Sequence, residues 1–356
     1  MKLINSYLYK EIEINKVDQN KTMFLKTIIN QIIFHKKNCL PYSNFINNLK
    51  LKLNKLNKIQ DVPFLHVNVF KEKDLFSVKK NKIYKILNSS GTTNQKVSKI
   101  YLDSENAKNQ IVILKKIVNS ILGQDRLPML IFEKNPNFIN RQKFGAKIAA
   151  IIGFSIFGKN YTYAINSQNE IDYRAINNFL KKINNKKFFI FGFTSSIYEY
   201  LFKKINNKKL YRSFNNSILI HGGGWKKIEK YKINNENFKK KIIDKLNVSK
   251  IINYYGLVEQ TGSIFIECDK CNCFHTNIFN DVIIRDKNLN PITEDNKIGM
   301  IQVLSILPSS YPGNSILLED EGYLINKTNK DCKNTGKSFK IIGRIPKAEI
   351  RGCSDV

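Results

Sequence analysis

The sequence predicts an α/β protein with a helical N-terminal region, a mostly parallel central sheet and a β-rich C-terminal subdomain. Residues 22–51 carry apolar side chains at helical spacing. Farther along, 126–134 and 186–195 have the length and composition of buried strands, and 145–154 between them has the pattern of a helix. Alternation of strand, helix and strand is typical of a parallel sheet covered on both faces.

The N-terminal part, up to about residue 60, is expected to be mostly helical, with Pro41 interrupting the pattern. Its first residues, "MKLINSYLYKEIEINK", include early acidic side chains and no sustained apolar core, so they do not resemble a secretory signal. The longest apolar stretch, at 148–157, is too short to span a bilayer. We therefore expect a cytoplasmic protein with no transmembrane segment.

The C-terminal part differs in composition from the rest of the chain. Short runs at 263–269, 281–286 and 300–306 are rich in β-branched residues. Each run has the length of a strand. These runs predict the β-rich subdomain.

The chain is strongly basic, with 59 Lys and Arg against 29 Asp and Glu and a formal net charge of +30. Such an excess predicts attraction to nucleic acid, to anionic membranes or to acidic partners. Arginine is nevertheless rare, and lysine is spread among Asn and Ile along the whole chain. This distribution favours a solvated lysine surface, and specific nucleic-acid binding is the least favoured function class.

A run of small hydroxyl residues, "NSSGTTNQKVSKIYLD" at 88–103, raises the possibility of a phosphate-binding loop. Gly91 permits a tight turn. The hydroxyl groups of four neighbours can donate hydrogen bonds to an anion beside exposed backbone N–H groups; these neighbours are Ser89, Ser90, Thr92 and Thr93. The same residues would also suit an ordinary polar turn.

Four further motifs follow this loop in the chain. "HGGGWKK" at 221–227 comes directly after the strand-like "SILI", where a strand ends and a ligand can approach the backbone. "NYYGLVEQTG", "LLEDEG" and "GRIPKAEIRGCSD" come next, at 253–262, 317–322 and 343–355.

In this order, the motifs resemble the adenylate-forming superfamily, which joins a carboxylic acid to AMP and transfers the acyl group to a thiol. More narrowly, "DVPFLHVNVFK", "DVIIRD" and "VLSILPSSYPG", taken with the motifs above, are similar to the acyl-protein synthetase family associated with the fatty acid reductase of luminous bacteria. The resemblance covers most of the chain. It implies the large N-terminal domain of the adenylate-forming fold, with ATP and Mg²⁺ as cofactors.

The resemblance also implies roles for individual residues at the nucleotide. The ATP phosphates would be held by Ser89, Ser90, Gly91, Thr92 and Thr93, with added positive charge from Lys99. The adenine would lie against Gly222, Gly223 and Gly224, with Tyr255 on the purine face. Tyr255 could equally be a core residue.

Three charged residues complete this implied site. Glu259 would bind Mg²⁺, which prefers carboxylate oxygen. Asp320 would accept hydrogen bonds from the ribose hydroxyls, and Arg344 would reach the ribose or the transferred phosphate. The alternatives are a surface carboxylate for Glu259 and a simple acidic turn for Asp320.

The sequence departs from the superfamily pattern in two places. Asn94 stands where a second glycine is usual in the phosphate loop, and Asn also tolerates the left-handed conformation. The chain ends at Val356, so we expect the usual small C-terminal domain, with its catalytic lysine, to be missing. That absence would disfavour coenzyme A as the acyl acceptor.

The resemblance assigns the acyl group to a cysteine near the C-terminus, and Cys353 falls on the matching position. Lys347 and Arg351 nearby would favour the thiolate, which is the nucleophilic form. The alternative is a small apolar residue in a terminal strand.

The other cysteines suggest a metal site. Six cysteines in a chain without a signal peptide favour reduced thiols over a disulfide framework. "CDKCNCFH" brings Cys268, Cys271, Cys273 and His275 close together in sequence, and Cys332 could complete a tetrahedral zinc site. Free thiols in a β-hairpin are the alternative, and His275 could instead belong to a pocket.

These observations predict a ligase that activates a carboxylic acid, with a long-chain fatty acid implied by the resemblance, and then acylates its own Cys353. An acyl reductase is the expected protein partner. The alternatives are an acyl- or aryl-coenzyme A ligase of the phenylacetate ligase type and a basic nucleic-acid-binding protein. We expect four segments: a helical region 1–80, an ATP-binding α/β subdomain 81–250, a β-rich subdomain 251–343 completing the nucleotide site, and a C-terminal segment 344–356 bearing the acyl-accepting cysteine.

Overall fold

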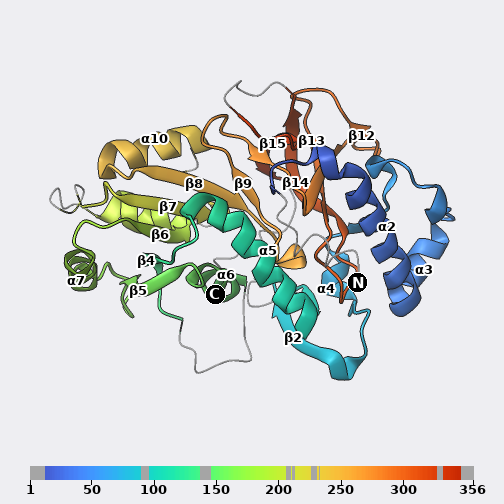
Figure 1. The fold of residues 1–356 in the computed structure, drawn as a ribbon, viewed down its shortest axis with the longest axis horizontal. Coiled ribbons are helices and arrows are strands. Elements are labelled where there is room, and N and C mark those ends of the chain that lie inside the picture. Colours follow the sequence, from blue (N-terminus) through green and yellow to red (C-terminus); the bar gives the residue numbers. More distant parts are fainter. Residues whose placement is uncertain are drawn as a thin grey trace. The chain divides into compact units, whose positions relative to one another are not determined.

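The chain folds into two compact units (Figure 1). Unit 1 comprises residues 1–117 and 256–349, and unit 2 comprises residues 118–255 and 350–356. The four-segment division expected from the sequence stays a prediction. The computed structural model describes residues 13–89, 96–136, 146–205, 210, 213–225, 231, 233–326 and 332–345.

Unit 2 is built on a parallel sheet. Its strands are β4 (Leu127–Lys134), β5 (Gly158–Ile165), β6 (Phe188–Phe193), β7 (Ser217–Gly222) and β8 (Lys250–Tyr255). They lie in the order β8-β7-β6-β4-β5, and each neighbouring pair is parallel. β6 and β7 are buried along their whole length, which explains their continuous apolar runs.

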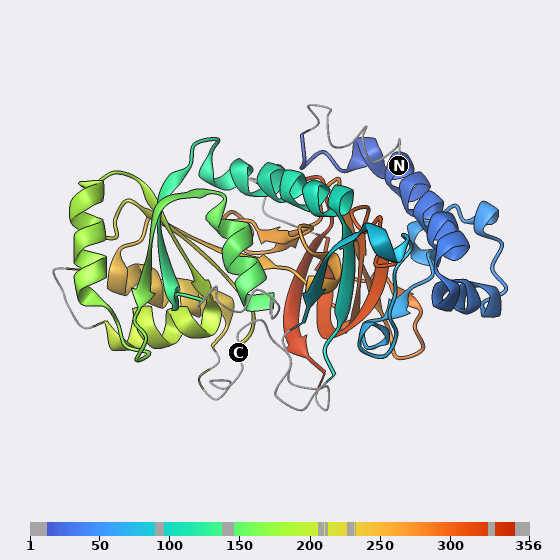
Figure 2. The same ribbon diagram turned by 90° about the horizontal axis from the view of Figure 1, so that it is seen from below.

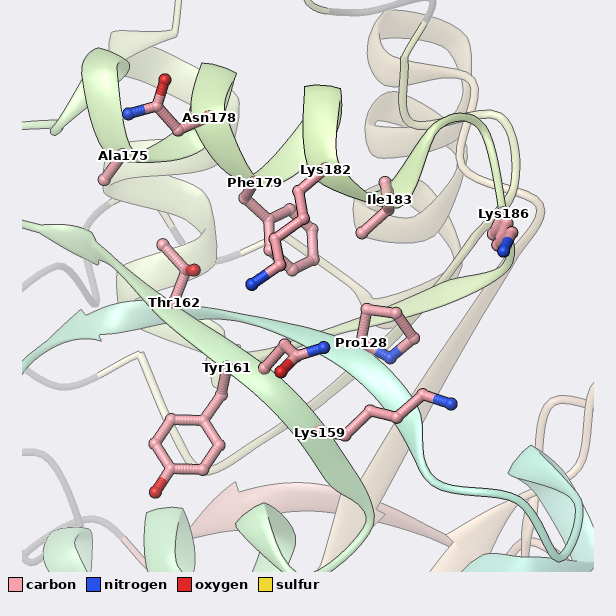
Figure 3. A pocket seen from close by; sticks show the side chains of 11 residues that line it. Pro128, Lys159, Tyr161, Thr162, Ala175, Asn178, Phe179, Lys182, Ile183 and Lys186 are labelled. Atoms are coloured by element: carbon pink, nitrogen blue, oxygen red, sulfur yellow. The ribbon is translucent and has the colours of Figure 1, made fainter.

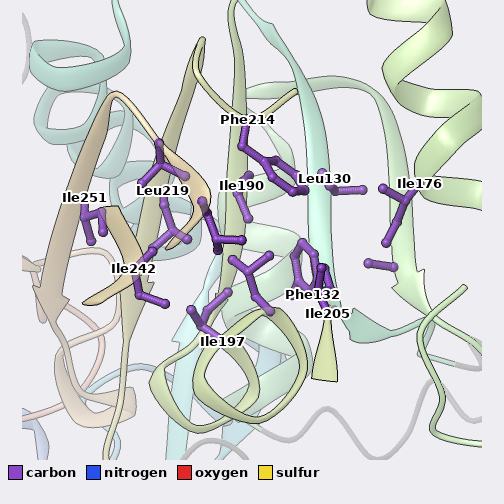
Figure 4. Close-up of a cluster of buried hydrophobic side chains, with 14 of the residues drawn as sticks. Leu130, Phe132, Ile176, Ile190, Ile197, Ile205, Phe214, Leu219, Ile242 and Ile251 are labelled. Atoms are coloured by element: carbon purple, nitrogen blue, oxygen red, sulfur yellow. The ribbon is translucent and has the colours of Figure 1, made fainter. Parts of the chain in front are cut away.

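Helices cover both faces of the unit 2 sheet. The face that carries Phe188 and Ile190 packs in one apolar cluster with α7 (Tyr173–Ile183), α10 (Asn235–Leu246) and the π-helical segment Ile197–Lys204, which follows α8 (Thr194–Ser196) (Figure 4). Phe191 points to the opposite face, where it stacks on Phe154 of α6 (Ala146–Ser155) with ring centroids 4.5 Å apart. Successive side chains of a strand point to opposite faces, so β6 supplies apolar side chains to both faces of the sheet.

Asparagine and aspartate delimit the unit 2 helices. Asp172 and Asn234 accept hydrogen bonds from the backbone N–H groups of the first turns of α7 and α10. Asn184 and Asn247 end the same helices with φ of 47° and 54°, the left-handed conformation that asparagine tolerates. Several asparagines of this Asn-rich chain therefore cap the ends of helices.

Unit 1 is built on a mostly antiparallel sheet. Its spatial order is β12-β11-β13-β14-β15-β10-β9, and β1 pairs in parallel with β14. The strands are β1 (Leu65–His66), β9 (Phe265–Glu267), β10 (Phe274–His275), β11 (Asn280–Arg285), β12 (Pro291–Ile292), β13 (Gly299–Ser305), β14 (Ser315–Ile325) and β15 (Ser338–Arg344). A separate antiparallel hairpin joins β2 (Ile83–Asn88) to β3 (Lys99–Asp103).

The N-terminal helices of unit 1 are α2 (Lys21–Asn38) and α3 (Leu40–Asn48), which lie side by side (Figures 1 and 2). Pro41 lies in the first turn of α3, where its missing N–H costs nothing. Gln31 of α2 donates to the carbonyl of Ile306 and accepts from Asn314, with distances of 2.6 Å for both bonds. These bonds fix α2 against the end of β13.

Two further α-helices are α4 (Val69–Glu72) and the long α5 (Ser104–Leu122). The strands expected at 126–134 and 186–195 and the helix expected at 145–154 agree with β4, β6 and α6 to within a few residues. Among the described residues, no helix combines the length and apolar character needed to cross a bilayer.

Candidate functional site

Asp320 and Arg344, which the sequence places 24 residues apart, are direct partners in the structure. They occupy the same register position on β14 and β15, and Arg344 Nε lies 3.9 Å from Asp320 Oδ1. Both side chains are partly exposed. The arrangement offers one carboxylate acceptor and one guanidinium donor at a single place on the sheet surface.

Glu259 lies in a buried 3-10 turn, Val258–Gln260, in the same unit. The side chain of Gln260 donates to the carbonyl of Gly313 at 2.8 Å, and the hydroxyl of Tyr311 donates to the carbonyl of Glu259 at 2.8 Å. A side chain on Gly313 would overlap the Tyr311 ring. The "SSYPG" segment therefore holds the Glu259 turn in place, a support that the local sequence did not reveal.

The pKa of Tyr311 is affected by the charge at this turn. Complete burial, together with the negative charge of Glu259, raises the pKa of Tyr311. Its hydroxyl consequently stays protonated and can donate to the Glu259 carbonyl throughout the physiological range.

The predicted phosphate loop connects the strands of the β2–β3 hairpin. Ser89 and Ser98 close the hairpin, because Ser89 N donates to Ser98 O at 3.0 Å and Ser98 N donates to Ser89 Oγ at 2.8 Å. The four remaining predicted loop residues lie outside the described part of the chain: Ser90, Gly91, Thr92 and Thr93.

Lys99 begins β3, opposite Asn88, so it stands beside this loop. Its Nζ lies 3.6 Å from Asp74 Oδ1, which also accepts a hydrogen bond of 2.7 Å from the Tyr101 hydroxyl. The Tyr101 hydrogen bond and then the Lys99 charge hold the pKa of Asp74 below its usual range. Asp74 is thus a carboxylate beside β3 that sequence motifs did not indicate.

The triglycine motif ends β7 in unit 2. A side chain on Gly222 would collide with the carbonyl oxygen of Tyr254, and Gly223 has a φ of 76°. Gly224 has open space around it. Two of these glycines are therefore demanded by local packing or backbone conformation.

Tyr255 ends the neighbouring strand β8 and is partly exposed, whereas Tyr254 is buried and packs on Phe154 and Phe191. Of these two tyrosines, Tyr254 is the one that packs in the core. Tyr255 and the three glycines belong to unit 2, and the acidic and basic residues described above belong to unit 1.

A pocket of about 520 Å³ lies between α7 and the start of β4 and β5 (Figure 3). Its lining includes Lys159, Lys182 and Lys186 and none of the residues singled out from the sequence. Its lining includes Pro128 and Lys159, which lie near the amino ends of β4 and β5, whereas ligands of such sheets bind at the carboxyl ends, where Gly222 lies. We therefore do not assign the nucleotide to this pocket.

A cluster of sulfur and nitrogen atoms lies beside the β9–β10 hairpin. Cys268 and Cys271 lie in the turn, His275 ends β10, and Cys332 comes from the chain before β15. One ligand atom from each residue lies within 4.8 Å of the others. Cys273 is not part of this group, because it is buried and its Sγ donates to the carbonyl of Cys271.

Cys353, the predicted acyl carrier, lies outside the described residues, so its surroundings stay a prediction.

Comparisons with known proteins show which family and fold this chain resembles. A long-chain-fatty-acid–luciferin-component ligase from Aliivibrio fischeri is 20% identical over 351 residues, covering 95% of this chain and 88% of that protein. An open conformation of 2-hydroxyisobutyryl-CoA ligase, solved with 2-HIB-AMP and CoA, superposes with a TM-score of 0.71 at 11% identity, covering 93% of this chain and 71% of that one. The same ligase in the postadenylation state gives a TM-score of 0.67.

The structural likeness confirms the predicted fold class, an α/β fold with a large mixed sheet like that of adenylate-forming ligases. The profile of the acyl-protein synthetase family, LuxE, matches residues 10–356. The chain therefore belongs to the LuxE family of acyl-protein synthetases, and it is a ligase.

Proposed function

We propose that this protein activates a long-chain fatty acid with ATP and then holds the acyl group as a thioester on Cys353. The observation that carries the proposal is the direct pairing of Asp320 with Arg344 in a chain whose residues 10–356 match the acyl-protein synthetases. The acid class follows the name of the Aliivibrio fischeri relative, a long-chain-fatty-acid–luciferin-component ligase.

In the first half-reaction, a carboxylate oxygen of the fatty acid attacks the α-phosphorus of ATP. An oxygen–phosphorus bond forms, the bond to the pyrophosphate group breaks, and pyrophosphate leaves an acyl adenylate behind. The attacking carboxylate is already ionised, so the step needs no general base. Catalysis then depends on positioning the two substrates and neutralising phosphate charge.

Residues of unit 1 suit that task. Lys99 and the hydroxyl-rich loop beside it would neutralise the phosphates, and Asp320 would accept hydrogen bonds from the ribose hydroxyls. Arg344, paired with Asp320, would be held in a defined orientation toward the ribose or the α-phosphate.

Glu259 suits a magnesium ion, because it offers a carboxylate on a buried, hydrogen-bonded turn. Magnesium bound there would offset the negative charge of the phosphate oxygens. Tyr311 and Gln260 would keep the turn rigid while the nucleotide binds and leaves.

In the second half-reaction, the thiolate of Cys353 attacks the carbonyl carbon of the acyl adenylate. A carbon–sulfur bond forms, the carbon–oxygen bond to AMP breaks, and AMP leaves. Lys347 and Arg351, close in sequence, would favour the thiolate. The thioester could then be delivered to an acyl reductase.

The first test is self-acylation with radiolabelled myristate, ATP and magnesium. We expect label on the polypeptide that neutral hydroxylamine removes, as it removes thioesters. Cys353→Ala should abolish the label and keep pyrophosphate release. Glu259→Gln should suppress both, because adenylate formation precedes acylation.

Asp320→Asn provides a graded test of the nucleotide site. Loss of a charge-assisted hydrogen bond should raise the KM for ATP by roughly tenfold. Glu321→Gln is the matched control, because Glu321 is the next residue on the same strand and we assign it no role at the nucleotide. Equal effects of the two variants would count against the assignment of Asp320.

The coenzyme A ligase alternative makes the opposite prediction for Cys353. Cys353→Ala would then remain fully active with coenzyme A, which would accumulate as acyl-coenzyme A, and the wild-type polypeptide would carry no label. Neither label nor pyrophosphate with long, short or aromatic acids would contradict adenylation itself.

A further inference from the structure

We infer that Cys268, Cys271, His275 and Cys332 bind one zinc ion, which has a structural role in unit 1. These four residues bring their ligand atoms within 4.8 Å of one another from two separate parts of the chain. The inference goes beyond the acyl transfer proposed above and does not depend on it.

Two of the sulfur–sulfur distances match a tetrahedral site. Zn–S bonds of about 2.3 Å place two thiolate sulfurs about 3.8 Å apart, and Cys332 Sγ lies 3.8 Å from the Sγ atoms of both Cys268 and Cys271. His275 Nε2 lies 3.0 Å from Cys271 Sγ and 3.4 Å from Cys332 Sγ. A disulfide would require sulfurs about 2.05 Å apart.

The backbone of the hairpin turn is shaped to present its sulfurs. Lys270 N points at Cys268 Sγ at 3.4 Å, and Asn272 N donates to the carbonyl of Cys268 at 2.9 Å. Asn272 has a φ of 52°, so the chain reverses directly after Cys271. A backbone N–H directed at sulfur stabilises negative charge on a metal-bound thiolate.

The histidine is oriented by a second contact. Ser338 Oγ lies 3.2 Å from His275 Nδ1, on the side of the ring opposite Nε2. This leaves Nε2 facing the sulfurs. Metal-bound histidines commonly hold their other ring nitrogen in a hydrogen bond of this kind.

Three sulfurs and one imidazole are the ligands that zinc prefers, and a site with four protein ligands has no position left for substrate. Such a zinc would be structural. It would tie the β9–β10 hairpin to the chain that enters β15, where Ser338 pairs with His275. The far end of β15 carries Arg344, so the metal would anchor the strand that presents the proposed nucleotide residue.

The test is metal analysis of the full-length protein after gel filtration in the presence of EDTA. We expect about one zinc ion per chain, released when a mercurial reagent modifies the thiols. Cobalt substitution should give the visible absorption of a tetrahedral, thiolate-bound cobalt ion. Both measurements use the unaltered protein, so they do not depend on any variant folding.

Variants then identify the ligands. Cys332→Ser should lower the zinc content at least about tenfold, and Ser338→Ala should weaken zinc affinity about tenfold through His275. Cys273→Ser is the matched control in the same hairpin and should retain zinc, because Cys273 Sγ is directed at a backbone carbonyl.

Three results would overturn the inference. Wild-type protein with no bound metal, in which the thiols of Cys268, Cys271 and Cys332 all react freely with a thiol reagent, would exclude a metal site. Iron in place of zinc would exclude the assigned metal. A mass two hydrogens lower than expected, with no metal, would indicate a disulfide among the three cysteines.

Discussion

Gly262 follows the Glu259 turn and has no room for a side chain. Its φ is 86°, and an added Cβ would lie 2.8 Å from both Cα and O of Gln110 on α5. Because the obstruction is backbone, it cannot move aside as a side chain would. Gly262→Ala should therefore lower the free energy of unfolding by about 3 kcal/mol, combining left-handed strain with a steric clash. Urea denaturation would measure the change.

Gly123 is the matched control for this prediction. It has a similar φ of 90°, but an added Cβ would meet nothing within 4 Å. Gly123→Ala should cost only the conformational term, about 1 kcal/mol. If the two variants lose equal stability, close packing on α5 is not the reason for glycine at position 262.

The sequence motifs identified residues that meet in space, but they did not identify what supports them. Asp320 and Arg344 could be named because each belongs to a long motif, and the structure pairs them. Tyr311 and Gln260, which hold the Glu259 turn, act through contacts between distant segments. Such contacts depend on the tertiary arrangement, and a single sequence contains no local signal for them.

At the scale of elements, a buried ion pair joins α6 to β4. Lys147 Nζ lies 2.7 Å from Glu133 Oε2, and the Glu133 side chain is 3% exposed. Glu133 Oε1 also accepts from the backbone N of Phe193 at 3.3 Å. Lys147→Met would leave this carboxylate buried without its cation, so the free energy of unfolding should fall by about 3 kcal/mol in denaturant titrations.

Two controls separate this effect from the loss of any lysine. The double variant Glu133→Gln with Lys147→Met should recover most of the stability, because no charge is then buried alone. Lys297→Met should change stability by less than about 0.5 kcal/mol, because the Lys297–Glu294 pair is exposed. A large loss in the double variant would show that Lys147 acts by packing and not by charge.

An element could be predicted where its burial leaves a clear pattern in the sequence. The parallel strands of unit 2 were visible because burial on both faces produces continuous apolar runs such as "FFIFGF". The β2–β3 hairpin was not predicted, since most of β2 alternates in burial and the strand carries a lysine, Lys85. The pairing of β10 with β15 was also hidden, because a strand of two residues leaves almost no pattern.

At the scale of the whole molecule, the net charge of +30 opposes compaction. Several of the described ion pairs are exposed, such as Lys16–Glu13 and Lys21–Asp18, and exposed pairs contribute little. The stability must come mainly from the apolar cores of the two units. This agrees with the interpretation of the lysines as a solvated surface.

Each unit has one histidine that is completely buried, His35 in unit 1 and His221 in unit 2, and these two residues link folding to pH. His35 in unit 1 is completely buried, with Nδ1 2.7 Å from Ser77 Oγ. Burial lowers its pKa from 6.5 to about 4. Burial and the charge of Lys239 lower the pKa of His221 in unit 2 from 6.5 to about 3.

The sign of the pH effect follows from these directions. Below pH 6.5, these histidines take up protons in the unfolded chain but stay neutral in the folded chain. Their contribution to the free energy of unfolding is therefore fully present above pH 6.5 and is lost as the pH falls toward the folded-state pKa values. Between pH 6 and pH 5, each histidine should contribute a loss of about 1.4 kcal/mol per pH unit at most. Urea denaturation at several pH values would measure this slope.

Histidine substitutions separate the contribution of the histidines to this slope from that of the carboxylates, which also titrate in acid. His35→Gln and His221→Gln should each flatten the slope between pH 6 and pH 5, even where they lower stability at pH 7. If both variants keep the wild-type slope, the buried histidines do not take up protons on unfolding. The acid sensitivity of both units would then have to arise from their carboxylates.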